Sequence, residues 1–236
     1  MLCVLCVLCM LCMLVPSVQA QAANATLHLQ PTDTQRHSEA QARNERDQMR
    51  ALAHTDGMTG LLNRRGLEDR MPMLLAQRLF HHNVALYLLD LDGFKDVNDT
   101  QGHDTGDALL RGVALRLQDS MHAPHLVCRL SGDEFVVVVV CELASATDAS
   151  AVGLKLLRAF DPPVPLLGTA SQDARQHPQG ITIGYALAPQ DAQSLNGLLS
   201  CADAGLYVGK QAGKHCVHLG SRGGLHQGVE QPLLEA

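Results

Sequence analysis

A run of five valines, Val136 to Val140, lies two residues after a pair of adjacent carboxylates, Asp133 and Glu134. β-Branched residues favour strands, and a strand that is apolar at every position is usually buried on both faces. Carboxylates are costly to bury unless they are paired or bind a cation. The run therefore predicts an inner strand of a buried sheet, with the acids either exposed at its end or holding something positive.

The residues before the valines have the pattern of a partner strand. The stretch "HLVCRL" precedes the sequence Ser131-Gly132-Asp133-Glu134, and "FVVVVVCEL" follows it. Two apolar runs joined by a short turn with glycine indicate a β-hairpin. The hairpin places both acids at its tip, so the valines can be buried while the carboxylates reach solvent or a ligand.

A second apolar strand also ends in acids. The stretch "VALYLLDL" at 84–91 carries Asp90 near its end, and Asp92 follows it. If this strand neighbours the hairpin, Asp90 and Asp133 converge, and close carboxylates repel each other unless a cation lies between them. Hard oxygen ligands with no His or Cys nearby suit Mg²⁺ or Mn²⁺. The pattern therefore predicts a divalent-metal site at this edge of the sheet.

Apolar periodicity predicts the remaining elements. The stretch at 54–71 bends at its glycines and then forms a helix, for which Thr55 or Asp56 is the expected cap. The other expected elements are helices near 35–54, 104–121, 144–160 and 194–214, strands at 180–189 and 216–219, and a loop over 161–178.

The overall charge limits which ligands the chain can bind. The formal net charge is -6, Trp is absent and aromatic residues make up only 3% of the chain. An acidic surface repels a polyanion, and few aromatic side chains are available for base stacking. We therefore expect no nucleic-acid partner, and any anionic ligand must be held locally by a metal ion or a few lysines.

The first 27 residues form a segment of a different kind. They carry no charged side chain and begin with "MLCVLCVLCMLCMLV". The apolar part is about 15 residues long, which is short for a span of about 20. Because arginines follow it, from Arg36 onward, the positive-inside rule places the rest of the chain in the cytoplasm. We expect a short membrane anchor; a signal peptide ending near "PSVQA" and an incorrectly assigned start are the alternatives.

Five stretches of this sequence together resemble one known family. Their order and spacing resemble the catalytic domain of diguanylate cyclases, called GGDEF after its signature, over residues 55–219. The stretches are "DGMTGLLNRRG" at 56–66, "LDLDGFKDVNDTQGHDTGD" at 89–107, "RLSGDEF" at 129–135, "ITIGYA" at 181–186 and "CADAGLYVGKQAGK" at 201–214.

The resemblance implies a fold and a reaction. The fold is of the α+β class, with a central, mostly antiparallel sheet flanked by helices. It is similar to the nucleotidyl cyclase and polymerase palm cores, which are ferredoxin-like. The reaction condenses two GTP molecules into cyclic di-GMP and releases two pyrophosphates. Each domain binds one GTP and two domains meet face to face, so the active unit is a homodimer.

The resemblance also implies roles for the acidic residues. Asp90, the carbonyl of Leu91 and Asp133 would bind Mg²⁺ or Mn²⁺. Asp133 or Glu134 would assist deprotonation of the attacking 3′-hydroxyl. A carboxylate can serve as this base because a metal-bound hydroxyl loses its proton more easily than a free one.

A second set of residues is implied to bind the substrate. Asn98 and Asp107 would recognise guanine, since an amide can donate and accept while a carboxylate accepts a paired N–H. His103 would lie in the same nucleotide-binding loop. The phosphates would contact three lysines, which are Lys95, Lys210 and Lys214.

The sequence departs from the family pattern at three places. Ser131 replaces the first glycine of the signature, in a turn where Gly132 lets phosphate approach the backbone. Lys214 replaces the usual arginine, which keeps the charge but loses the planar fork. His122 and His125 occupy the positions of the family's RxxD product-inhibition site, so we expect no high-affinity product feedback there.

Two functions follow from this pattern. The first is an active diguanylate cyclase. The alternative is a catalytically impaired GTP-binding module that regulates a partner, which the serine at position 131 would favour. The expected organisation is a hydrophobic anchor or signal-like segment at 1–27, a polar linker with a connecting helix at 28–54, the catalytic domain at 55–219 and a disordered tail at 220–236.

Overall fold

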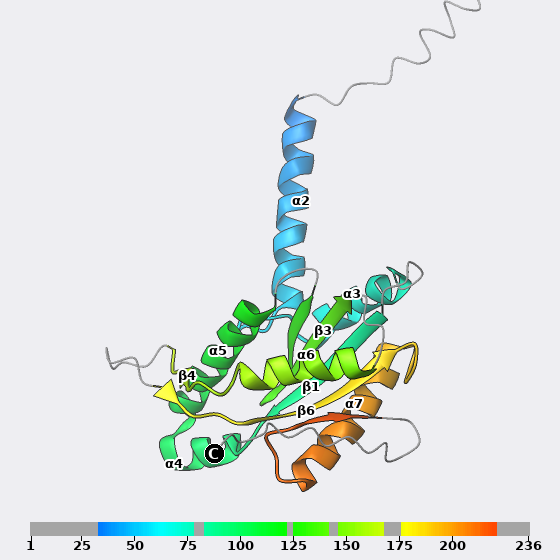
Figure 1. Cartoon of the computed structure of the whole chain (residues 1–236). Coiled ribbons are helices and arrows are strands. Elements are labelled where there is room, and N and C mark those ends of the chain that lie inside the picture. Colours follow the sequence, from blue (N-terminus) through cyan, green and yellow to red (C-terminus); the bar gives the residue numbers. More distant parts are fainter. Residues whose placement is uncertain (1–32, 78–82, 122–124, 142–145, 168–175, 221–236) are drawn as a thin grey trace, which may run out of the picture. The chain divides into compact units, whose positions relative to one another are not determined.

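The structure is a computed structural model that describes residues 33–77, 83–121, 125–141, 146–167 and 176–220 (Figure 1). The chain divides into two units, Met1–Met49 and Arg50–Ala236. Across the described ranges, no helix has both the length and the apolar character needed to cross a membrane. The expected membrane segment and all but the first residue of the expected tail lie outside the described residues.

Helix α2 (Asp33–His54) forms the polar stretch that the sequence predicted to be a connecting helix. Its two large apolar side chains near the end, Met49 and Leu52, are 70% and 78% exposed. Since exposed apolar side chains three residues apart lie on the same side of a helix, α2 presents a small apolar stripe to its surroundings.

A five-stranded sheet forms the centre of the larger unit. Its strand order is β2-β3-β1-β6-β7. All neighbours are antiparallel except β6 and β7, which are parallel, so the predicted mostly antiparallel α+β fold is confirmed. The strands are β1 (Asn83–Leu91), β2 (Leu126–Ser131), β3 (Glu134–Cys141), β6 (Ile181–Ala188) and β7 (Val217–Leu219).

Helices cover both faces of this sheet (Figure 1). On one face, Tyr87 and Leu89 of β1 belong to the same buried cluster as residues of α5 (His103–Ser120) and α6 (Ala146–Arg158). On the other face, Leu86 and Leu88 pack in a cluster with α3 (Arg64–Gln77) and α7 (Leu195–Gln211). Because side chains alternate along a strand, Asp90 shares the face of Leu88 and α7.

The valines of β3 are buried as predicted. Val136, Val137 and Val138 each have no exposed surface, and they alternate between the two clusters. The strand pairs with β1 on one side and β2 on the other, so both of its edges are hydrogen-bonded. The run is apolar at every position because β3 is buried on both faces of the sheet.

Helix α7 packs closely onto the sheet because a glycine lies on each side of the contact, Gly184 in β6 and Gly209 in α7. A Cβ on Gly184 would lie 1.9 Å from the carbonyl oxygen of Ala202, and one on Gly209 would lie 2.7 Å from Cγ2 of Thr182. Contacts that short are not tolerated between real side chains and backbone. The close approach fixes the C-terminal end of α7, and with it Lys210, beside the sheet.

Three local predictions need correction. Helix α4 (Phe94–Gln101) was not predicted, because only Val97 of its residues is buried and no apolar period marks it. The expected loop contains two short paired strands, β4 (Val164–Pro165) and β5 (Gln176–His177).

The predicted cap of α3 is also wrong. Asn63 caps the helix, and its Oδ1 accepts a hydrogen bond of 2.9 Å from the N–H of Gly66. Asp56 instead closes the preceding turn, where it accepts from the N–H and the hydroxyl of Thr59 at 2.9 and 2.7 Å. Asparagine and aspartate satisfy free backbone donors equally well, so the sequence did not show which one precedes the helix.

Candidate active site

The end of β1 and the hairpin tip bring three carboxylates to one edge of the sheet. Asp90 is the Cα partner of Glu134 in the antiparallel register, and Asp133 immediately precedes Glu134 in the turn. Partial burial raises the pKa of Asp133, the nearby carboxylate of Asp90 raises it further, and Glu134 adds to the same effect. Asp90 and Asp133 therefore converge as the sequence predicted.

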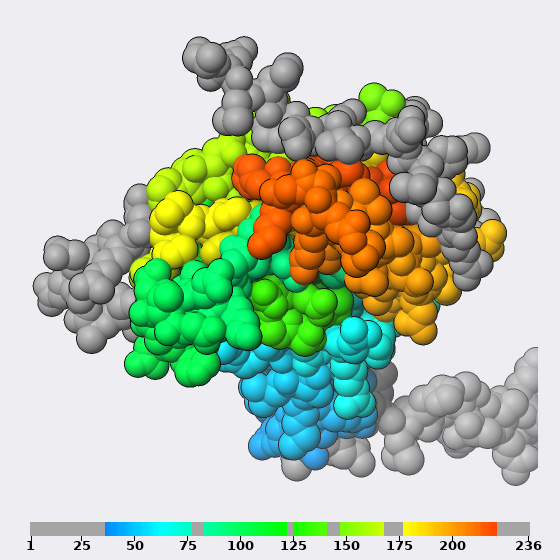
Figure 2. All heavy atoms as spheres, turned by 90° about the horizontal axis from the view of Figure 1, so that it is seen from below, coloured from blue at the N-terminus to red at the C-terminus, as the bar shows by residue number. Residues whose placement is uncertain are grey.

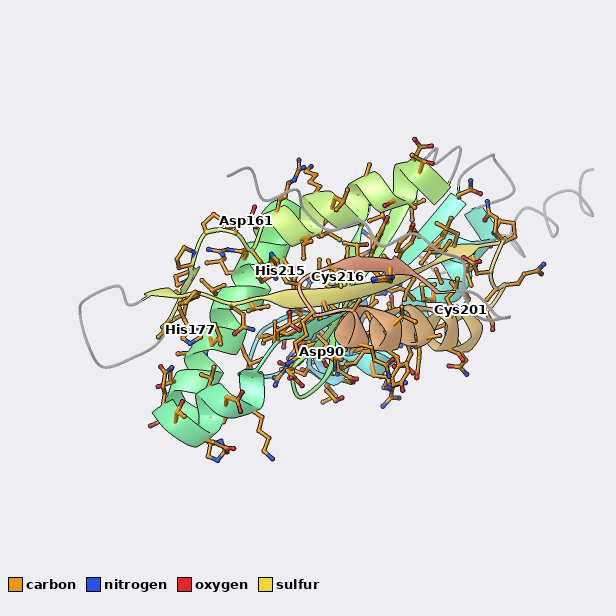
Figure 3. All side chains as sticks on the ribbon, turned by 60° about the horizontal axis from the view of Figure 1, so that its bottom comes forward. Asp90, Asp161, His177, Cys201, His215 and Cys216 are labelled. Carbon is orange, nitrogen blue, oxygen red and sulfur yellow. The ribbon has the colours of Figure 1, made fainter. Side chains whose placement is uncertain are left out.

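Lysine 210 lies against this acidic edge. Its Nζ is 2.8 Å from Oδ2 of Asp90, whose side chain is only 13% exposed. Figure 3 shows Asp90 beside the helix α7 that carries this lysine. A partly buried carboxylate is stabilised by such a pair, so the lysine occupies the place where positive charge is needed.

The hairpin turn is held by an arginine. Arg129 donates from Nε and Nη2 to the carbonyl oxygen of Gly132, at 3.0 and 2.8 Å. Its Nη1 also lies 3.2 Å from Oδ1 of Asp56. Burial acts to raise the pKa of Asp56, but hydrogen bonds from Thr59 and Arg129 outweigh it and lower that pKa. The turn that presents Asp133 is thus fixed to a second loop.

The serine of the signature turn fits without backbone strain. Among the described residues other than glycine, only Lys214 and His215 have positive φ, so Ser131 has φ below zero. The left-handed position of the turn is taken by Gly132, with φ of 47°. The Ser131 hydroxyl donates a hydrogen bond of 2.9 Å to Oε2 of Glu134.

The predicted guanine-binding residues lie on two adjoining helices. Asn98 is in α4 and Asp107 is in the first turns of α5. The Asn98 side chain packs against Gly106, where a Cβ would lie 2.0 Å from its Oδ1. His103 is the first residue of α5, so the expected loop around it is a helix start, and the exposed Lys95 lies in α4.

Asp92 has a positioning role that sequence reasoning missed. It accepts hydrogen bonds from the hydroxyl of Thr182 at 2.8 Å and from the N–H of His215 at 3.1 Å. These contacts tie the segment after α7 to the sheet. Lys214, which precedes His215 with φ of 67°, is thereby held near the end of α7. The only sequence signal was that Asp92 follows the strand end.

One hollow of the larger unit includes a residue of this site, Glu134. A groove of about 280 Å³ lies between α3, α7 and the sheet. Figure 2 shows this side of the molecule, where the green surface of the hairpin lies between the blue-green α4 and the orange α7. The groove is lined by Arg64, Leu88, Leu130, Glu134, Asn196, Leu199, Ser200 and Asp203.

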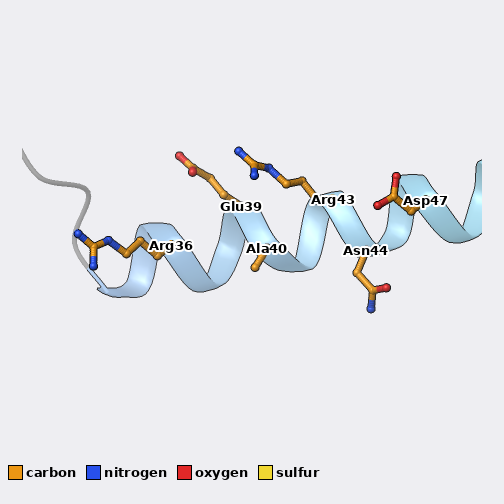
Figure 4. Close-up of a pocket in the computed structure, with 6 residues that line it drawn as sticks. All are labelled: Arg36, Glu39, Ala40, Arg43, Asn44 and Asp47. Atoms are coloured by element: carbon orange, nitrogen blue, oxygen red, sulfur yellow. The ribbon is translucent and has the colours of Figure 1, made fainter.

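A second hollow runs along α2 and measures about 480 Å³ (Figure 4). Its charged side chains alternate in sign, in the order Arg36, Glu39, Arg43 and Asp47. Side chains three or four residues apart on a helix are neighbours, so these opposite charges support the helix. The hollow contains none of the predicted site residues.

The donor set fits a hard divalent cation. Within the described ranges, no group of three or more His, Cys, Asp or Glu side chains is arranged to hold a metal ion. The edge offers instead two carboxylates, Asp90 and Asp133, and the predicted third donor is the main-chain carbonyl of Leu91. Burial first, and then the charges of Asp90 and Glu134, raise the pKa of Asp133, although Lys210 acts to lower it.

A protein-family model identifies the chain. The model described as "Diguanylate cyclase, GGDEF domain" matches residues 53–216. The chain therefore belongs to the GGDEF domain family, and the resemblance found in the sequence is confirmed.

Known proteins agree with this assignment. The diguanylate cyclase TpbB of Pseudomonas aeruginosa is 33% identical over 174 residues, which is 73% of this chain. The solved GGDEF domain of the same protein gives a TM-score of 0.64 at 32% identity, covering 71% of this chain and 95% of that domain. The coiled coil and GGDEF domain of DgcB from Caulobacter crescentus, solved with c-di-GMP, gives 0.65 at 25% identity, covering 86% and 99%.

The chain is much shorter than its relatives. It spans well under half the length of the curated proteins that it matches, for example 39% of TpbB.

Proposed function

We propose that this protein is a diguanylate cyclase, which condenses two GTP molecules into cyclic di-GMP and two pyrophosphates. The observation that carries the proposal is the convergence of Asp90 and Asp133 at one edge, with Lys210 paired to Asp90 at 2.8 Å. Membership of the GGDEF family and the c-di-GMP bound to the DgcB structure support it.

Asp90, Asp133 and the carbonyl of Leu91 would hold the Mg²⁺ or Mn²⁺ ion. When bound, the cation neutralises charge on the triphosphate and makes the attacking 3′-hydroxyl more acidic. The raised pKa of Asp133 supports this assignment, because a cation beside the two carboxylates relieves their repulsion.

The lysines would bind the phosphates. Lys210 reaches the acidic edge from α7, and Lys214 lies four residues further along the chain at an exposed position. Negative charge builds on the phosphoryl oxygens during attack at the α-phosphate, and fixed cations stabilise it. Lys95 is exposed on α4 and would contact the phosphates as well.

Guanine would be recognised between α4 and α5. The carboxylate of Asp107 would accept paired N–H groups from the base edge, and the amide of Asn98 would donate and accept. His103 begins α5 next to these residues and is exposed. This set selects guanine over adenine, since adenine lacks the donor pair that a carboxylate requires.

The base would be Asp133 or Glu134. Both lie on the turn that Arg129 holds, and a base needs a fixed position within hydrogen-bond reach of the proton that it removes. The raised pKa of Asp133 makes that group better suited to accept a proton than an ordinary aspartate.

The active unit would be a homodimer, because one domain binds one GTP and the product contains two. Helix α2 precedes the domain and exposes Met49 and Leu52, which would pair with a second copy. We also propose that the catalytic domain lies in the cytoplasm and that residues 1–27 attach it to the membrane.

The alternative is an impaired GTP-binding module that regulates a partner. It rested on Ser131, whose Cβ would strain a turn of positive φ. Since Ser131 has φ below zero, the backbone gives no reason for lost turnover.

Incubating the purified chain with GTP and Mg²⁺ tests the proposal. Cyclic di-GMP and pyrophosphate should form in a ratio of one to two, and chelation should stop the reaction. GTP binding without product would instead support the regulatory module.

A further inference from the structure

The signature turn of this chain contains a hydrogen bond that a glycine cannot make. Ser131 and Glu134 are the last Cα partners of the β2–β3 hairpin. The hydroxyl of Ser131 donates to Oε2 of Glu134 over 2.9 Å. A hydrogen bond to a charged group is among the stronger ones, so it restrains the torsions of the glutamate.

The same turn is fixed by a separate contact at the backbone. Arg129 holds the carbonyl of Gly132 through two hydrogen bonds. A Cβ at Gly132 would meet nothing within 4 Å, so the outer side of the turn is open. Arg129 therefore holds the backbone of the turn. The Ser131–Glu134 hydrogen bond instead restrains a side chain.

Electrostatic repulsion acts to move Glu134 away from the sheet edge that carries Asp90 and Asp133, here called the catalytic edge. It faces Asp90 across the strand pair, and its charge contributes to raising the pKa of Asp133. It also lines the groove that contains Arg64, a cation on the adjacent helix. Repulsion from the edge and attraction to Arg64 act in the same direction, so a Glu134 without the serine hydroxyl would move further from Asp90 and toward Arg64.

We propose that Ser131 is a positioning residue, whose hydroxyl holds the Glu134 carboxylate at the catalytic edge. The serine thus supplies a function in this turn instead of merely replacing a glycine. The inference rests on the proposed cyclase activity and adds a residue to its machinery.

Kinetics of five variants test the inference. Ser131→Ala and Ser131→Gly each remove the hydroxyl, and Ser131→Thr keeps it. We expect the alanine and glycine variants to lose about three- to tenfold in kcat with KM for GTP unchanged, since one restraining hydrogen bond is lost. The threonine variant should stay within twofold. Adding Ser131→Ala to Glu134→Gln should cause a smaller loss than Ser131→Ala causes in the parent, because the neutral amide already weakens the hydrogen bond that the hydroxyl makes.

Three outcomes would overturn the inference: an alanine variant as fast as the parent, a threonine variant as slow as alanine, or full additivity with Glu134→Gln. A carbon-13 label on the glutamate carboxylates gives a readout independent of turnover. The Glu134 resonance should shift in the alanine variant and not in the threonine variant. If the parent makes no cyclic di-GMP but the Glu134 resonance still shifts in the alanine variant alone, the proposed activity is wrong and the hydrogen bond is confirmed. A Glu134 resonance that does not shift in the alanine variant overturns the inference.

Discussion

Lys210 and Asp90 form an ion pair of 2.8 Å that joins the end of α7 to the end of β1. The two residues are 120 positions apart in the chain, and the glycine-lined contact between α7 and β6 brings them together. The lysine stands where a cation is expected to bind beside Asp90. Binding of the metal ion and GTP would therefore free the lysine from Asp90 and let it turn to the phosphates.

Replacing Lys210 tests its part in phosphate binding. Lys210→Gln should raise KM for GTP and lower kcat/KM by about ten- to a hundredfold, because a fixed cation at the phosphates is lost. Initial rates over a range of GTP concentrations measure this. Lys155→Gln, an exposed lysine on α6 outside the site, is the matched control and should behave like the parent. Unchanged kinetics in the Lys210 variant would remove this lysine from the site.

Removing either acid should abolish turnover. Asp90→Ala or Asp133→Ala takes away a metal ligand and should slow the reaction by at least about a thousandfold. The fold should survive, since both residues lie at strand ends and only partly within the core. Asp119→Ala, at the exposed end of α5, is the control. A variant with near-normal turnover and an unchanged need for metal would show that the metal site lies elsewhere.

The raised pKa of Asp133 predicts how stability depends on pH without metal. Burial and Asp90 make the folded state bind its proton more tightly than the unfolded chain does. Between the ordinary aspartate pKa and the raised one, the folded state holds more protons, so stability falls as pH rises through this window.

Asp133→Asn removes that effect. With a chelator present, the variant should melt at a higher temperature than the parent near pH 7, and the difference should shrink as the pH falls through the window. Calorimetric melting at several pH values measures it, with Asp119→Asn as the control. If the parent instead became more stable relative to Asp133→Asn as the pH rose, the assigned direction of the Asp133 pKa shift would be wrong.

Much of this site follows from sequence because its residues are tied to strand ends. Asp90 and Asp133 each end or follow an apolar strand, and a strand's end is readable from the change in composition. Their predicted convergence was conditional on strand 84–91 neighbouring the hairpin, and the β1–β3 register, with Asp90 opposite Glu134, meets that condition.

Positioning residues were harder to predict. Asp56 and Arg129 are 73 residues apart, and each reads alone as an ordinary turn or strand residue. Asp92 was recognised as an acid at a strand end, but its bonds to Thr182 and His215 depend on where the segment after α7 returns. Such contacts depend on tertiary packing that no local pattern contains. Helix α4 was missed for a related reason, since its single buried residue gives no periodic signal.

A methyl group at Gly106 should disturb guanine recognition. Its Cβ would lie 2.0 Å from Oδ1 of Asn98, so the amide must move. Gly106→Ala should therefore raise KM for GTP by about tenfold, while the fold remains because the displaced atom is the end of a side chain. Gly57→Ala, where nothing lies within 4 Å, is the matched control. If the KM of the variant rises equally for inosine triphosphate and for GTP, the lost contacts are ones that both bases make. An unchanged KM for GTP would place Asn98 outside the guanine site.

Product feedback should be weak in this protein. The positions of the family's RxxD site carry His122 and His125, of which only His125 lies in the described residues. Burial lowers the pKa of His125 and the charge of Lys155 lowers it further, and its Nδ1 accepts from the N–H of Val140 at 3.4 Å. His125 stands at the aspartate position of that site, and a neutral imidazole that is already accepting a hydrogen bond cannot supply the negative charge of a carboxylate.

Progress curves test this directly. The rate of product formation should continue unchanged as cyclic di-GMP accumulates to micromolar concentrations, apart from the decline caused by GTP consumption. Replacing His122 with Arg and His125 with Asp restores the RxxD pattern, and this double variant should slow as product accumulates. Strong noncompetitive inhibition of the parent by added cyclic di-GMP would show that the protein binds its product at a site other than these two positions.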